Sequence, residues 1–150
     1  MILDPTRRDM LSGAAASILA AALTSSSASA DAETLQREIW RLMGDRKAKE
    51  EQITLETPVL AENGAVVPVH IIVQSPMSEE DHVRAIHLLA EENPWPTIMS
   101  MRLAPEAGKA DVRFRVRLAR TQNVYAFAEM NDGRIFRAVR RVEVTIGGCG

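Results

Sequence analysis

The sequence predicts a mainly β protein, a β-sandwich of about seven short strands preceded by one short helix. Three observations predict it. Short apolar segments, many rich in β-branched residues, recur from residue 53 onward, Gly, Pro and Asn-Gly signals separate them, and only the stretch before residue 50 carries a clear helical period. The 150 residues are 46% hydrophobic and 25% charged, which suits one globular domain with a buried core.

The helix is expected between Ala32 and about Lys49. Its apolar residues recur at helical spacing among charged neighbours: Leu35, Ile39, Leu42 and Met43. This spacing places them on one face of a short amphipathic helix, which we expect to be an appendage of the sandwich.

The first strands are expected at Ile53-Thr54-Leu55 and at Val66 to Val73, with Asn63-Gly64 as a turn between them. The second of these segments contains Pro68, which has no N–H to give to a neighbouring strand. Pro68 therefore predicts an edge position or a bulge.

The segment from Asp81 to Glu92 gives an ambiguous signal. Ser78-Glu79-Glu80-Asp81 before it is typical of a helix N-terminus, so local propensity favours a helix. Pro94-Trp95-Pro96 ends the segment, and Thr97 to Leu103 is expected to be extended.

Val112 to Arg120 has the clearest strand pattern. Its apolar residues alternate with Arg113, Arg115 and Arg117, which are expected to point to the opposite face. Such an arginine ladder is usually the solvated face of a strand. Its alternative role is to dock an acidic partner surface or to attract a small anion.

The last two strands are expected at Val124 to Met130 and Arg137 to Ile146, joined by a hairpin turn at Asn131-Asp132-Gly133. Val124 to Met130 is apolar on both faces, as in a central strand. Arg140 shares the apolar face of the last strand, which predicts a bulge near Arg140-Arg141.

Residues 1–30 have the three-part layout of an export signal. Arg7-Arg8 precede an apolar stretch from Gly13 to Leu23, and Ala28-Ser29-Ala30 is an A-x-A cleavage site. The adjacent arginines favour the twin-arginine route. We therefore expect a twin-arginine signal peptide at 1–30 and a periplasmic domain at 31–150, with no membrane insertion after cleavage.

Charge and metal-ligand patterns exclude two classes of function. The chain carries 18 basic and 20 acidic side chains, a net charge of −2, so nucleic acid is not an expected partner. His70, His82 and His87 have spacings that match no usual zinc pattern, and the chain has one Cys. We expect no metal and no cofactor.

The candidate site is the end of the chain, where Cys149 lies among Gly147, Gly148 and Gly150. Glycines make a slim segment with wide conformational freedom, so 147–150 is expected to be a carrier arm that threads its thiol into a narrow cleft of another protein. Four extended residues span at most roughly 14 Å. Sites of this kind present a cargo and need no catalytic residue, and we assign none.

Two alternatives for Cys149 stay open at this point. The oxidising periplasm permits an interchain disulfide through this exposed thiol. A thiol oxidoreductase that uses Cys149 directly is the second, although the α-carboxylate of Gly150 lies one residue away and its negative charge disfavours the thiolate. A resolving Cys is also absent from the sequence.

The terminal Ile-Gly-Gly-Cys-Gly and the twin-arginine leader, with four body segments, together resemble the SoxY family, the sulfur-carrying subunits of the Sox thiosulfate-oxidation system. The body segments are Ser75-Pro76-Met77, Ala85-Ile86-His87, Glu92-Asn93-Pro94 and Ala128-Glu129-Met130-Asn131-Asp132-Gly133. The resemblance covers essentially all of 31–150. The family ending is Gly-Gly-Cys-Gly-Gly, and this sequence stops one glycine earlier.

The resemblance implies an immunoglobulin-like sandwich, a heterodimer with a SoxZ-like subunit, and Cys149 as the attachment site of thiosulfate-derived sulfur. It also implies that haem-containing SoxXA enzymes load Cys149, that SoxB releases sulfate, and that a sulfur dehydrogenase oxidises the remaining sulfur. The protein itself would be a carrier and not an enzyme. The resemblance further implies that Asp81 to Glu92 is a strand, and we follow it there against the local helix signal.

Overall fold

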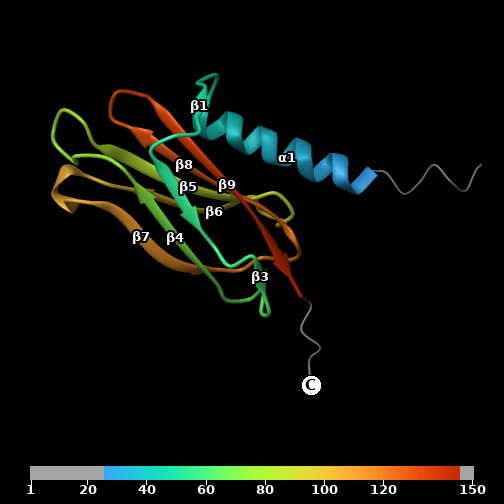
Figure 1. Cartoon of the computed structure of the whole chain (residues 1–150). Coiled ribbons are helices and arrows are strands. Elements are labelled where there is room, and N and C mark those ends of the chain that lie inside the picture. The colour runs from blue at the N-terminus through green and yellow to red at the C-terminus, as the bar shows by residue number, and fades with distance from the viewer. Residues whose placement is uncertain (1–25, 146–150) are drawn as a thin grey trace, which may run out of the picture.

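Two β-sheets pack face to face in this protein, and one helix covers the outer face of the larger sheet (Figure 1). The computed structural model describes the backbone of residues 26–145 and the side chains of residues 31–145. The described elements, in chain order, are α1 (Ser26–Met43), β1 (Ala48–Lys49), β2 (Ile53–Glu56), β3 (Leu60–Ala61), β4 (Val67–Val73), β5 (Val83–Ala90), β6 (Thr97–Arg102), the 3-10 helix η1 (Pro105–Ala107), β7 (Ala110–Val116), β8 (Gln122–Met130) and β9 (Ile135–Val144).

The larger sheet has the order β1-β9-β8-β5-β6, with β3 also paired to β9, and the smaller sheet has the order β2-β4-β7. β1 and β3 pair with β9 in parallel, and the longer strands pair antiparallel. Seven strands of four residues or more, with two two-residue strands, confirm the predicted sandwich within the described residues.

The sandwich core lies between the two sheets. Alternating side chains of the facing strands fill it, including the fully buried Leu55, Ile71, Ile86, Leu88, Val124 and Val142. In β4 the burial alternates strictly, with Val67, Val69, Ile71 and Val73 inside. The period of two in the sequence thus corresponds to one buried and one outward face.

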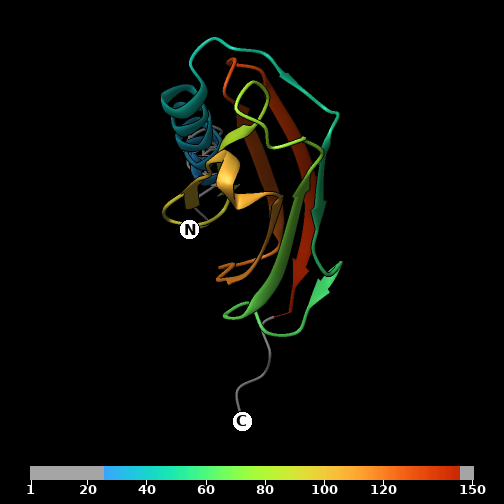
Figure 2. The ribbon, with the colours of Figure 1, turned by 90° about the vertical axis from the view of Figure 1, so that its left-hand side faces the viewer.

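A second apolar cluster joins α1 to the outer face of the larger sheet, and Figure 2 shows the helix against that face. The cluster consists of Leu35 and Met43 from the helix with Leu89, Phe127 and Ile135 from three strands. β5 and β8 are therefore apolar on both faces because one face meets the smaller sheet and the other meets the helix.

The helix begins earlier and ends earlier than predicted. It ends at Met43 because Gly44 adopts a left-handed conformation, with φ of 64°, and its N–H donates to the Trp40 carbonyl at 2.7 Å. The five residues after Gly44 include the short strand β1. Residues 1–25 of the expected signal peptide lie outside the described residues.

Pro68 lies in the central strand of the smaller sheet and the register of β4 with β7 has no shift, so the predicted edge position or bulge is wrong. The register explains why it is tolerated: β7 runs beside all of β4, but β2 pairs with β4 only from His70 to Val73. On the β2 side Pro68 therefore faces no strand, and its missing N–H removes no ladder hydrogen bond there.

The predicted bulge near Arg140-Arg141 is also wrong. The β8–β9 register runs without a shift from Gln122 opposite Val142 to Glu129 opposite Ile135. Arg140 is exposed to solvent instead, since the opposing sheet has only three strands and leaves part of β9 uncovered.

The segment after Ser78 forms the strand β5, as the family resemblance implied and against the local helix signal. β5 lies between β6 and β8, and its residues from Ala85 to Ala90 are all buried. Burial of both faces in the sheet outweighs the weak preference of the preceding residues for a helix.

Candidate functional site

The surface around the end of β9 is the candidate site, because it is the part of the described structure nearest in sequence to Cys149. The described chain ends at Thr145, four residues before that cysteine. The predicted attachment residue Cys149 and the predicted arm glycines, Gly147, Gly148 and Gly150, lie outside the described residues.

Three hydrogen-bonding neighbours hold the end of β9. The Glu143 N–H donates to the Val59 carbonyl at 2.8 Å, and the Thr145 N–H donates to the Ala61 carbonyl at 3.1 Å. Between them the Val144 N–H donates to Thr121 Oγ1 at 2.9 Å. The backbone is therefore anchored on both sides up to Thr145.

Gly64 packs against the same end of β9. A Cβ at Gly64 would lie 2.5 Å from the Leu118 carbonyl oxygen and 2.7 Å from Val144 Cγ1. The Gly64 carbonyl accepts the Leu118 N–H at 2.8 Å. Only a residue without a side chain lets this turn approach β9 so closely.

Exposed apolar side chains lie on the segments that contact this anchored end. Val59 is 76% exposed, Leu60 is 49% exposed and Val66 is 50% exposed. Leu60 lies opposite Glu143 in the β3–β9 pair, so part of this apolar surface adjoins the point where the chain leaves the sandwich.

Asn93 supports the segment that contains Thr121. Its amide accepts hydrogen bonds from the Ala119 N–H and from Gln122 Nε2, and it donates to the Arg117 carbonyl at 2.9 Å. Gln122 is fully buried and also accepts the Glu92 N–H at 2.9 Å. The segment Glu92-Asn93-Pro94, which contributed to the resemblance, thus has a structural role near the end of β9.

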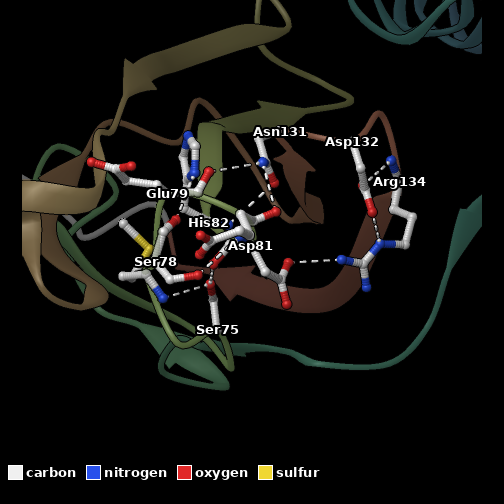
Figure 3. Close-up of polar contacts among 10 residues, drawn as sticks. Ser75, Ser78, Glu79, Asp81, His82, Asn131, Asp132 and Arg134 are labelled. Atoms are coloured by element: carbon white, nitrogen blue, oxygen red, sulfur yellow. Dashed lines mark hydrogen bonds and ion pairs between the residues drawn. The ribbon is translucent and has the colours of Figure 1, made fainter.

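Two further segments of the resemblance meet at a loop cluster (Figure 3). Asn131 Oδ1 accepts the His82 N–H at 3.2 Å, and Asn131 Nδ2 donates to the Glu80 carbonyl at 3.0 Å. In the same cluster Ser75 Oγ accepts the Met77 N–H at 3.2 Å. These contacts fix the loop before β5 against the β8–β9 turn.

Arg134 closes this cluster through two carboxylates, Asp81 at 2.7 Å and Asp132 at 2.5 Å (Figure 3). The backbone N–H and the guanidinium of Arg134 lower the pKa of Asp132. Gly133 has φ of 90° and its N–H donates to the Met130 carbonyl, which confirms the predicted hairpin turn.

The three histidines lie at three different places. Both ring nitrogens of His70 are occupied by carboxylates, Glu56 and Asp111, each at 2.8 Å. His82 contacts the Ser78 carbonyl, and His87 contacts Ser100. Within residues 26–145, no three His, Cys, Asp or Glu side chains are grouped to hold a metal ion.

Arg113 and Arg115 of the arginine ladder lie on the outer face of the smaller sheet, as predicted. Arg117 follows the strand, because β7 ends at Val116 and not at the predicted Arg120. Arg113 and Arg115 line a cavity of about 610 Å³ together with Glu56 and His70. The carboxylates of Glu56 and Asp111 stand among these basic groups, so the surface is of mixed charge.

The structure also brings together three charged residues that the sequence analysis did not identify as a group: Arg46, Arg84 and Glu129. This group lies on the helix-covered face, where the buried Glu129 contacts Arg46 and Arg84. Burial alone would raise the pKa of Glu129, but hydrogen bonds and the charges of Arg46 and Arg84 lower it. Residues of different elements meet here, and the sequence has no local motif that could have indicated it.

Among residues 26–145, no helix has the length and apolar composition needed to cross a membrane.

No curated protein matches the chain. The model of the family "Sulfur oxidation protein SoxY" matches residues 39–149, which includes Cys149.

The chain is similar to the sulfur carrier protein SoxY from Chlorobium limicola f thiosulfatophilum. The two share 32% identity with a TM-score of 0.64, over 77% of this chain and 99% of that chain. Superoxide reductase (neelaredoxin) from Ignicoccus hospitalis shares 20% identity with a TM-score of 0.56, over 63% of this chain and 81% of that one. The similarity to superoxide reductase shows a common fold alone.

The family match begins at residue 39, within α1, and continues through the sandwich to Cys149. It shows that this chain belongs to the SoxY family.

Proposed function

We propose that this protein is a periplasmic sulfur carrier that holds thiosulfate-derived sulfur covalently on Cys149 and presents it to partner enzymes. The observation that carries the proposal is the family match, which continues through the end of β9 to residue 149. The similar SoxY of Chlorobium limicola is described as a sulfur carrier protein. The sequence of residues 1–30, which has the layout of a twin-arginine leader, supports the location.

The geometry suits a carrier. The sandwich is anchored up to Thr145, and Cys149 follows four residues later. Four residues span at most roughly 14 Å, which is enough to bring a thiol into an enzyme pocket while the sandwich stays outside. The protein contributes the thiol and its delivery, and the partner enzymes contribute the catalysis.

The attachment step needs an electron acceptor. Joining the Cys149 sulfur to the outer sulfur of thiosulfate forms an S–S bond, releases the thiol proton and yields two electrons. Haem-containing SoxXA enzymes would take those electrons. SoxB would then hydrolyse the sulfone as sulfate, and a sulfur dehydrogenase would oxidise the sulfur that remains. A SoxZ-like subunit would form the heterodimer that these enzymes recognise.

Intact mass analysis of protein from thiosulfate-grown cells tests the proposal. We expect added sulfur-containing mass that reduction removes, and its complete loss in a Cys149→Ser variant. A single unmodified mass before and after reduction would contradict the carrier function. A mass of twice the chain that reduction halves would indicate an interchain disulfide instead.

A further inference from the structure

A recess of about 710 Å³ lies on the helix-covered face of the larger sheet. It is lined by Arg41 of α1, by Arg84 and His87 of β5, by Ser100 and Arg102 of β6, and by Glu129 of β8. Four separate elements of the chain thus contribute to one polar recess. It lies on the face of the larger sheet against which α1 packs, and Figure 2 shows that helix and that face.

Positive charge exceeds negative charge at this recess. Glu129 is already contacted by Arg46 and Arg84, and Glu38 is contacted by Arg41 at 2.8 Å. Arg102 has no carboxylate partner among the residues that the structure describes. Three guanidiniums and one carboxylate line the recess, and Arg46 and Glu38 pair with Glu129 and Arg41 from outside the lining, so two positive charges remain in excess.

His87 is a mostly buried residue that supplies a polar atom at the wall of the recess. The residue is 8% exposed, and its Nδ1 lies 2.8 Å from Ser100 Oγ. Its Nε2 has no hydrogen-bond partner within residues 26–145, yet it is not among the polar atoms sealed from solvent there. Nε2 is therefore open to the recess and available to a ligand there.

In its neutral form, His87 can carry its one ring proton on Nε2, which makes this atom a hydrogen-bond donor. Burial, with the charges of Arg41 and Arg46 acting against that of Glu129, lowers the pKa of His87, so the ring is neutral at pH 7. The Ser100 hydroxyl can donate to Nδ1, and the neutral ring then carries its proton on Nε2. Nε2–H and the nearby guanidiniums are all donors.

We propose that this recess binds a small tetrahedral oxyanion with two negative charges, of the sulfate and thiosulfate type, through Arg84, Arg102 and His87 Nε2–H. Guanidinium forks match paired oxygens of such an anion, and two unbalanced positive charges match a dianion. The excess positive charge of the recess disfavours cations. Chloride is a single atom, so it cannot accept the paired hydrogen bonds of a guanidinium as two oxygens of an oxyanion can. The site is separate from the proposed attachment of sulfur to Cys149 and does not depend on it.

Calorimetric titration of sodium sulfate into the full chain carrying Cys149→Ser tests this site without any contribution from the thiol. Ionic strength is held constant with sodium chloride. We expect saturable binding, and we expect Arg102→Gln to weaken it at least tenfold, which corresponds to about 1.4 kcal/mol. Parallel titrations with thiosulfate and phosphate show which oxyanion the site prefers.

Arg141→Gln is the matched control, because Arg141 is exposed, lies outside the recess and changes the net charge equally. Its sulfate affinity should stay within about twofold of the parent. The ¹⁵N resonance of His87 Nε2 should shift with the calorimetric isotherm, and amide spectra check that each variant is folded. Absence of saturable sulfate binding, or equal weakening by Arg102→Gln and Arg141→Gln, would overturn the proposal. Neither result would affect the detection of sulfur on Cys149.

Discussion

The Thr121 hydroxyl oxygen accepts the backbone N–H of Val144 at 2.9 Å, one residue before the end of the described chain. Thr121 stands directly before β8, and Val144 is the last residue of β9. This contact fixes the strand end from which the segment with Cys149 continues. The anchoring of the described chain end therefore depends in part on a hydroxyl in a loop.

Thr121→Val removes that acceptor with little change in side-chain shape. Because the Val144 N–H then loses its partner, we expect unfolding free energy to fall by about 1–2 kcal/mol. Urea unfolding measures it. Thr54→Val, an exposed change on the outer face of β2, should stay within about 0.5 kcal/mol. Equal midpoints for parent and Thr121→Val would show that the contact contributes nothing.

Replacing both Gly147 and Gly148 by Val should block delivery of Cys149 while leaving stability unchanged to within about 0.5 kcal/mol. β-branched residues stiffen and widen the segment. Thiosulfate oxidation reconstituted with partner enzymes should fall at least about tenfold, or about 1.4 kcal/mol. Small thiol reagents should label Cys149 at a near-normal rate, which serves as the control. Undiminished turnover would show that the glycines are not needed as a tether.

Co-expression with a SoxZ-like chain should yield a one-to-one complex. β6 ends one sheet, and β2 and β7 end the other, so unpaired strand edges are available among the described residues. A stable interface of this type buries about 1,600 Å² in total. Size-exclusion chromatography with light scattering measures the mass. A monodisperse monomer in the presence of the second chain would contradict the heterodimer.

Glu129→Gln should lower the unfolding free energy at pH 7 by about 1–3 kcal/mol, because two arginines lose their shared carboxylate. The folded-state pKa of Glu129 lies below its ordinary value of 4.5, so its contribution is present above that pH and is lost as the pH falls through the folded-state pKa. The difference between the parent and Glu129→Gln should therefore shrink between pH 7 and pH 3. Denaturant unfolding at the two pH values measures it, with the exposed Glu106→Gln as control. A difference that grew toward low pH would be contrary to this expectation.

His87 should titrate below its ordinary pKa of 6.5, because burial disfavours the charged ring and Arg41 and Arg46 add to that effect against Glu129. The neutral ring is the form that the fold favours. Its contribution to stability is complete above the unfolded-state pKa and declines as the pH falls toward the folded-state pKa. Imidazole ¹⁵N shifts in an oxyanion-free buffer give the midpoint, and a midpoint above 6.5 would be inconsistent with the buried ring.

Local pattern determined much of the fold. The alternation predicted from Val112 to Arg120 forms the strand β7, although that strand spans Ala110–Val116, and the Asn131-Asp132-Gly133 turn forms as predicted; each is specified within a few residues. The candidate attachment residue was also identifiable from sequence, since a lone Cys among terminal glycines needs no tertiary partner to stand out.

Tertiary structure decided the rest. Residues 83–90 form a strand because β6 and β8 pair with it on both sides, and Pro68 is tolerated because β2 stops short of it. The recess joins Arg41, His87 and Arg102, which are separated by up to 61 positions in the sequence. Such a site arises only when α1 packs on the sheet, because no local period or spacing links side chains that meet through the packing of separate elements.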